Sequence, residues 1–303
     1  MKLIKITNPI YKLLKKIIKF KASSLIVESN YVRDSNKPNK VFFKKKNNVF
    51  FLQKSVYRKQ DIYKKLFKDN KKKDFFNLNI NNKKFTLKII DDESRRYNQF
   101  KFVIKNRSVL DYGSGYGDFL RKFKKNRVAA IEKRDDCITF LKKKKIQTYE
   151  DISSIKDKFD FITFFNSIDH LEYPDHTLKK IKRNLNKNGK IIIEVPNANN
   201  ILYKLNIAEF KNFSFCQKHL IIHSEKSLTN LLKYSGYQVE KTLYFQRYNL
   251  NNHINWILNK KPGGHTMLKN LVNIYSNENY KNLLIEKKLA DTLIIIAKPN
   301  VKN

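Results

Sequence analysis

The feature that most constrains this 303-residue chain is a cluster of three of its seven glycines, at Gly113, Gly115 and Gly117. The cluster follows directly on a short apolar run that ends in Asp111. A strand that passes at once into closely spaced glycines is typical of a tight turn that brings backbone close to a ligand. The pattern predicts a nucleotide-type cofactor loop.

The glycine spacing and the charges around it indicate which cofactor the loop holds. A dinucleotide loop has the spacing Gly-x-Gly-x-x-Gly, which leaves a helix N-terminus open to a pyrophosphate. Here the third glycine comes one residue early, and Asp118 takes the next position. Asp111 and Asp118 would repel a pyrophosphate but suit a ligand that carries an ammonium and a sulfonium. We therefore expect S-adenosylmethionine as the cofactor; a glycine-rich turn without a ligand is the alternative.

Composition favours a globular protein from a reducing compartment. Hydrophobic residues make up 41% of the chain, with 22 Phe and 16 Tyr, which is enough to build a core. The two cysteines, Cys137 and Cys216, lie far apart without a Cys-x-x-Cys pattern. They form neither a disulfide framework nor a zinc site. We expect a cytoplasmic protein without a metal site.

The net charge of +37 is a weak indicator of function. A basic balance is typical of proteins that bind nucleic acid or anionic membranes. Here the excess is spread along the chain, with abundant Asn and Ile and little Gly, Pro, Trp or Met, a mixture typical of an AT-rich genome. We expect no nucleic-acid partner, and the sequence leaves the oligomeric state open.

No segment has the uninterrupted apolar length needed for a transmembrane helix. Residues 1–20 alternate apolar residues with Lys, a pattern that fits an amphipathic basic helix. We expect this helix to pack on its own domain. Peripheral contact with an anionic membrane surface, or a role as a transit peptide, is the alternative.

The chain divides near residue 100. Residues 1–100 lack glycine and carry Lys-rich runs between aromatic clusters, which predicts an irregular basic cap whose polar end leads into a main domain, 101–303. From residue 107, apolar runs alternate with helical ones, which predicts an α/β fold, doubly wound and mainly parallel, with helices on both faces. The expected strands are 108–111, 128–132, 146–149, 159–165 and 190–195, and the expected helices are 117–126, 135–144, 177–185 and 225–235.

Acidic residues follow the second and third expected strands. Glu132 comes about twenty residues after Asp111, where a carboxylate accepts both ribose hydroxyls. A surface Glu at the start of the next helix is the alternative. After the third strand, Asp151 is placed to receive the adenine amino group while Ile152 packs on the ring. A plain helix N-cap by Asp151 is the alternative.

Several ordered segments together resemble a known family. Segments 109–117, 159–175 and 183–197, together with Glu132, look like class I S-adenosylmethionine-dependent methyltransferases. Within that superfamily the chain is most similar to the branch with ubiquinone-biosynthesis-like and sugar methyltransferases. The resemblance covers about residues 105–245 and implies a seven-stranded sheet whose last strand, 291–298, is antiparallel. It also implies that the chain is an enzyme.

The resemblance further implies roles for residues around the cofactor. The expected contacts are Asp111, Gly113, Ser114, Gly115 and Gly117 around the methionine part, Glu132 at the ribose, Asp151 and Ile152 at the adenine, and Asn166 and Ser167 beside the reactive methyl. The family's two glycines are replaced at Asn188-Gly189, a change confined to a turn. The chain also lacks the Asn-Pro-Pro-aromatic run and the Cys nucleophile of enzymes that methylate bases, which argues against a nucleic-acid substrate.

Three histidines are candidates for the base that a hydroxyl acceptor needs. His170 follows the fourth strand at the mouth of the site. His219, with His223 nearby, precedes the last helix. His265 lies in an insertion, 248–289, before the last strand. For each histidine the alternative is a structural or surface role.

The insertion also holds the only tryptophan, Trp256. We expect it to overhang the methyl group and shape the acceptor pocket, with Trp256 stacking on a sugar face. The alternative is a Pro-Gly-Gly turn between surface helices. The sequence thus predicts a methyltransferase that acts on a small molecule, a hydroxyl of a sugar or related metabolite. An RNA or protein methyltransferase, and a cofactor-binding interaction module without catalysis, are the alternatives.

Overall fold

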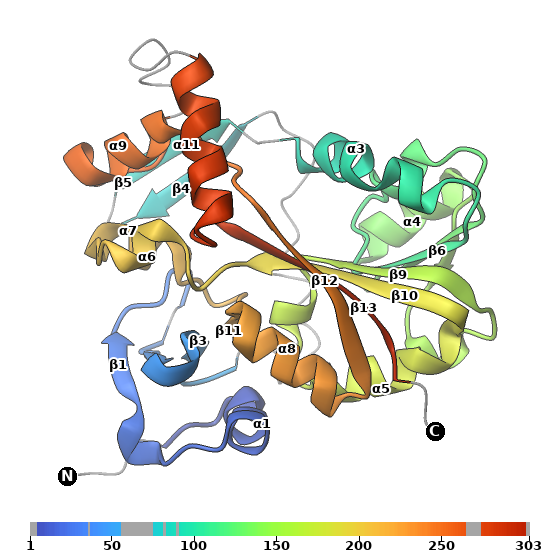
Figure 1. Cartoon of the computed structure of the whole chain (residues 1–303), viewed down its shortest axis with the longest axis horizontal. Coiled ribbons are helices and arrows are strands. Elements are labelled where there is room, and N and C mark those ends of the chain that lie inside the picture. The colour runs from blue at the N-terminus through green and yellow to red at the C-terminus, as the bar shows by residue number, and fades with distance from the viewer. Residues whose placement is uncertain are drawn as a thin grey trace.

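The computed structural model describes residues 5–35, 37–55, 75–80, 83–88, 91–264 and 274–300. Its main element is a seven-stranded sheet in the order β12-β13-β10-β9-β6-β7-β8 (Figure 1). The bounds are β6 Val109–Tyr112, β7 Val128–Ile131, β8 Gln147–Tyr149, β9 Phe159–Phe165, β10 Leu185–Pro196, β12 Tyr237–Phe245 and β13 Thr292–Pro299. Strands β10, β9, β6, β7 and β8 are parallel, and β13 is antiparallel to both of its neighbours. The predicted α/β fold is confirmed.

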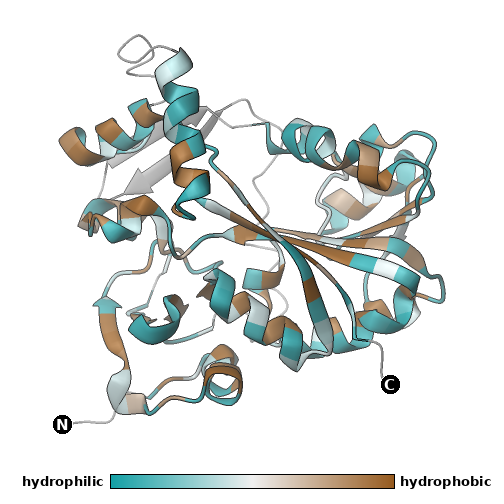
Figure 2. Ribbon diagram, viewed as in Figure 1, coloured by the Kyte–Doolittle hydropathy of each residue, from teal (hydrophilic) through white to brown (hydrophobic). Residues whose placement is uncertain are grey.

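Helices cover both faces of this sheet, because alternate strand residues point to opposite sides. In β13, Leu293 and Ile295 belong to one apolar core and Ile294 to the other. The first core also takes side chains of α5 (Pro174–Ile181) and α8 (Glu225–Tyr234), and the second takes side chains of α3 (Asp92–Ile104) and α4 (Asp135–Lys143). Figure 2 shows hydrophobic colour along the strands and both colours on the helices.

Two local expectations differ from the structure. The helix predicted at 117–126 is a single 3-10 turn, Leu120–Lys122. Gly117 before it has a left-handed backbone, which a right-handed helix does not contain, so no helix begins at that residue. Phe119, Leu120 and Phe123 are buried in the second core. Residues 91–100, the polar stretch predicted to lead into the main domain, form most of helix α3.

The region expected to be an irregular cap contains regular structure. Helix α1 (Pro9–Ile18) precedes a four-stranded sheet in the order β1-β2-β3-β11. Its strands are β1 Ile26–Ser29, β2 Val41–Lys44, β3 Val49–Leu52 and, from the C-terminal half of the chain, β11 Ile221–Ile222. The remaining elements are the hairpin β4 Phe75–Ile80 and β5 Lys83–Lys88, and helices α6 Ile201–Lys204, α7 Ala208–Ser214, α9 Leu250–Asn259 and α11 Ile274–Glu286. No helix of the described residues is long and apolar enough to cross a membrane.

The N-terminal sheet shares its core with the main domain, which can be tested at Phe51. This side chain is 1% exposed, and its strand position pairs with Ile221. We expect Phe51→Ala to lower the free energy of unfolding by about 3–5 kcal/mol, because a large cavity would replace the ring. Urea denaturation of the full chain measures it, with the exposed Tyr31→Ala as the control. If the substitution destabilised only a separate transition at low urea concentration and left the main transition unchanged, the two parts would not share a core.

Candidate functional site

The glycine loop lies where the strand order of the large sheet reverses, at the carboxyl ends of β6 and β9. Ligands of open α/β sheets bind at this point. Gly113, Gly115 and Gly117 all have left-handed backbone, with φ of 74°, 56° and 68°. A Cβ added at Gly113 would lie 3.0 Å from the Cβ of Ser167, so the loops after β6 and β9 touch. The glycines are therefore required by backbone conformation and by close approach.

Glu132 lies beside the glycine loop, as its position after the second strand predicts. The side chain is buried, and one carboxylate oxygen accepts a hydrogen bond from the backbone N–H of Gly115 at 2.8 Å. The other oxygen accepts from the N–H groups of Lys133 and Arg134, at 2.7 and 3.0 Å. Glu132 thus joins the loop to the end of β7 and has a fixed orientation.

The two aspartates that flank the glycine loop have different surroundings. Asp111 is buried at the end of β6, whereas the charge of Asp118 is balanced by an arginine. The hydroxyl of Thr163 donates a 2.7 Å hydrogen bond to Asp111. Burial nevertheless raises the pKa of Asp111 to about 7. Asp118 forms an ion pair with Arg121. A cation beside the loop would therefore act mainly on Asp111, whose ionised form it would stabilise.

This raised pKa predicts a pH-dependent affinity for a cationic ligand. In acid, Asp111 carries a proton that a bound cation must displace, so the Kd for S-adenosylmethionine should rise as the pH falls below about 7. We expect an increase of up to about tenfold per pH unit. Calorimetry between pH 5 and pH 8 measures it. In Asp111→Asn the pH dependence should disappear, and a wild-type slope in that variant would refute the assignment.

The other predicted cofactor residues occupy different surroundings. Asp151 is exposed and accepts hydrogen bonds from the N–H and hydroxyl of Ser153, at 2.8 and 2.6 Å, so it caps the turn that begins at the buried Ile152. Ser114 and Ser167 have buried hydroxyl oxygens that make no hydrogen bond to any described residue. Asn166 has a left-handed backbone. Buried polar atoms without protein partners at a loop of this kind favour a ligand that supplies them.

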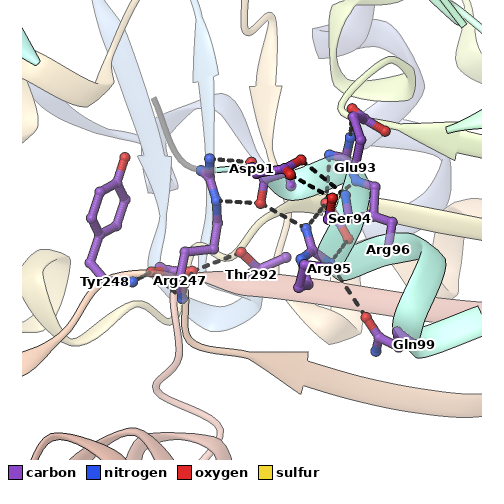
Figure 3. A network of polar contacts seen from close by, with 12 residues as sticks. Asp91, Glu93, Ser94, Arg95, Arg96, Gln99, Arg247, Tyr248 and Thr292 are labelled. Atoms are coloured by element: carbon purple, nitrogen blue, oxygen red, sulfur yellow. Dashed lines mark hydrogen bonds and ion pairs between the residues drawn. The ribbon is translucent and has the colours of Figure 1, made fainter. Parts of the chain in front are cut away.

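A polar network joins α3 to the carboxyl end of β10 (Figure 3), and no local pattern in the sequence indicates it. Arg95 donates to both oxygens of Glu194, at 2.5 and 2.8 Å, and Arg96 donates to one of them at 2.7 Å. Arg247, after β12, pairs with Asp92. Glu194 is 1% exposed, and these arginines hold its pKa below the usual value against the effect of burial. The network fixes α3 beside the site.

A cavity of about 200 Å³ adjoins this network. Its lining comes from the ends of β9 and β10, the start of β13, helices α6, α7 and α9, the loops that precede β11 and follow β12, and one N-terminal residue. Its walls include Tyr203, Phe210, Phe213, Trp256, His219 and Arg33. The insertion therefore does contribute to a pocket, since Trp256 lines it. Asn166 lines the cavity as well, so the cavity reaches the loop after β9.

His219 is the predicted base candidate that lines this cavity. Its Nδ1 lies 2.5 Å from Oδ2 of Asp169, which is completely buried. Burial alone would lower the pKa of His219, but Cys216 and Asp169 outweigh it and raise the pKa to about 10. A carboxylate that orients an imidazole in this way is the arrangement found in proton-transfer sites.

The other histidine candidates differ from His219. His170 packs edge-on against His219, with ring centroids 4.9 Å apart, and burial lowers its pKa to about 4. Possible ligand atoms of Asp169, His170 and His219 lie within 4.8 Å of one another, so these three residues could hold a metal ion. His223 is buried, its Nδ1 2.9 Å from the hydroxyl of Ser227. His265 lies outside the described residues.

Comparison with known proteins gives one family match and several similar structures. A family model described as a methyltransferase domain matches residues 56–242, and no curated protein matches the sequence. A SAM-dependent methyltransferase from Archaeoglobus fulgidus is similar at 20% identity and a TM-score of 0.46, over 68% of this chain and 94% of that one. A 1,6-didemethyltoxoflavin-N1-methyltransferase from Burkholderia thailandensis is similar at 12% identity and a TM-score of 0.41, over 70% and 78%.

Proposed function

Given that the chain belongs to the methyltransferase-domain family, we propose that it transfers the methyl group of S-adenosylmethionine to a hydroxyl of a small molecule, a sugar or a related metabolite. Within the family we place it in the branch with ubiquinone-biosynthesis-like and sugar methyltransferases. The observation that carries the proposal is the Asp169–His219 pair in the wall of a cavity that reaches the loop after β9.

The residues around the glycine loop fit this cofactor. The buried carboxylate of Asp111 suits its positive charges, and the unsatisfied hydroxyls of Ser114 and Ser167 offer hydrogen bonds. Gly113 and Gly115 leave the backbone open to the methionine part. The other proposed contacts are Gly117, Glu132 at the ribose, Asp151 and Ile152 at the adenine, and Asn166 beside the methyl.

The chemistry asks little of the protein beyond alignment and removal of one proton. S-adenosylmethionine supplies a methyl group bound to a sulfonium. The acceptor oxygen attacks this methyl carbon in line, and the neutral thioether S-adenosylhomocysteine leaves. The cavity walls would hold the acceptor and exclude water. Holding the acceptor oxygen in line with the methyl group raises the reaction rate, because the two reacting atoms are already aligned. His219 would take the hydroxyl proton on Nε2 while its Nδ1–H remains bonded to Asp169.

The size of the cavity favours a small acceptor. A volume of about 200 Å³ suits a ring of sugar size better than an RNA strand or a protein segment. The aromatic walls, Trp256 and Phe210 among them, offer faces on which a sugar ring can stack. These features support a small-molecule methyltransferase over the macromolecular alternatives.

Release of S-adenosylhomocysteine tests the proposal. The purified protein is incubated with S-adenosylmethionine and with pools of sugars, nucleotide sugars and phenols, and the product is measured by mass spectrometry. We expect release that depends on at least one pool. Tight binding of S-adenosylmethionine without release from any pool would point instead to the cofactor-binding interaction module.

A further inference from the structure

Arg33 lines the acceptor cavity from the connection between β1 and β2, and hydrogen bonds hold its backbone on both sides. Its N–H donates to the carbonyl of Phe215 at 2.8 Å, and its carbonyl accepts from the N–H of Gln217 at 3.1 Å. The guanidinium lies over the ring of Phe213, 4.8 Å from the centroid. The side chain is 15% exposed, so most of its charge is removed from water. A stacked, anchored guanidinium is preorganised for binding.

Two of the three nitrogens of this guanidinium donate no hydrogen bond to a described residue. Nε and Nη1 of Arg33 are buried, and neither makes a hydrogen bond to a residue in the described part of the chain. The nearest carboxylate, on Asp34, is 43% exposed and lies 3.4 Å from Nε. A buried donor without an acceptor costs about 1–3 kcal/mol, so its presence calls for an explanation.

Three other charged residues of the cavity wall have strong partners within the protein. Glu194 is paired with Arg95 and Arg96, and Arg247 is paired with Asp92. Asp291 accepts hydrogen bonds from the backbone N–H groups of Arg247 and Tyr248 and from the side chain of Gln246. Arg33 differs from these residues, because its ion pair among the described residues is with the exposed Asp34 and two of its buried nitrogens keep donors that no described residue accepts.

From this geometry we propose that the acceptor carries an oxyanion, a carboxylate or a phosphate, which binds the guanidinium of Arg33 in the cavity that contains His219. The planar fork of an arginine matches the paired oxygens of both groups. The aromatic faces of Phe213 and Trp256 lie in the same cavity and would hold the ring that carries the oxyanion. This inference rests on the proposed function, since it assumes that the cavity is the acceptor site.

The only tryptophan reports directly on this cavity, so binding can be measured without turnover. Emission of Trp256 in the full chain is followed during titration with glucose, glucose 6-phosphate and glucuronate, and with inorganic phosphate alone. We expect the two charged sugars to bind at least about tenfold more tightly than glucose, because a charge-assisted bidentate contact is worth more than 1.4 kcal/mol. The phosphate and carboxylate arms distinguish the two oxyanions.

Variants of Arg33 assign the effect to this residue. Arg33→Gln should abolish the preference for charged sugars, and Arg33→Lys should retain part of it, because the charge remains but the fork is lost. Arg127→Gln removes the same charge near the amino end of the large sheet, where Arg127 pairs with Asp157, and should leave the preference unchanged. Thermal unfolding of each variant verifies that it folds.

Two results would overturn the inference. One is equal affinity for glucose and for both charged sugars, or no change of Trp256 emission with any oxyanion. The other is a preference for charged sugars that survives in Arg33→Gln. Neither touches the proposed function, which is judged by release of S-adenosylhomocysteine. Conversely, oxyanion binding that depends on Arg33 without methyl transfer to any acceptor would leave this site in place and contradict only the proposed function.

Discussion

Replacement of His219 by Asn is expected to lower the rate of methyl transfer by about 100-fold or more, which is the typical contribution of a positioned general base. The affinity for S-adenosylmethionine should stay within about threefold of the wild type, because His219 lies on the acceptor side. Release of S-adenosylhomocysteine measures the rate, and calorimetry measures cofactor binding. The effect on kcat should therefore greatly exceed the effect on cofactor affinity.

If His219 is the base, the rate of methyl transfer should increase with pH. The pKa of His219 is raised to about 10, so near neutral pH most molecules carry a protonated imidazole that cannot accept another proton. The rate should therefore rise with pH, about tenfold per unit, and level off near pH 10. Asp169→Asn removes the carboxylate that favours the charged imidazole, so the rise should shift to lower pH.

Two histidines serve as matched controls. His253 lines the same cavity, but its Nδ1 faces the hydroxyl of Tyr280 at 2.7 Å instead of a carboxylate. His176 is exposed on α5. Neither His253→Asn nor His176→Asn should change the shape of the pH profile. A folded His219→Asn variant that keeps both the wild-type rate and its pH dependence would exclude His219 as the base.

The sequence predicted those parts of the fold that depend on nearby residues. Strand β6, the glycine loop and β7 follow one another along the chain, so the two apolar runs and the glycines between them are visible in order. Glu132 could be assigned to the glycine loop for a similar reason. The loop follows β6, Glu132 follows β7, and these two strands are neighbours in the sheet. Local periodicity and turn chemistry were sufficient here.

Contacts between distant segments escaped prediction. Strand β3 pairs with β11, and nothing in either short apolar run specifies the other as its partner. Helix α3 has a polar sequence because its arginines pair with Glu194 of β10, and without that carboxylate the segment reads as a linker. The carboxylate partner of His219 could not be predicted for the same reason, because Asp169 and His219 meet only through the fold.

The second large effect is expected at Glu132, where Ala should weaken the binding of S-adenosylmethionine and S-adenosylhomocysteine by about 100-fold or more. We propose that this carboxylate accepts both ribose hydroxyls, and hydrogen bonds to a charged group are worth about 1.5–3 kcal/mol each. The substitution also removes the acceptor for the N–H of Gly115, so the glycine loop loses its link to β7. Both effects act in the same direction. Calorimetry of the two ligands measures the change in Kd.

Glu132→Gln separates these two contributions. The amide oxygen can still accept from Gly115, whereas the negative charge is lost, so the increase in Kd should be smaller, about tenfold. Asp157→Asn, a carboxylate on the surface beside Arg127, provides the control and should leave both affinities unchanged. Because the ribose is common to both ligands, the loss in Glu132→Ala should be equal for them within about twofold. A loss for S-adenosylmethionine alone would mean that Glu132 acts on the sulfonium end, and wild-type affinity for both would remove it from the cofactor site.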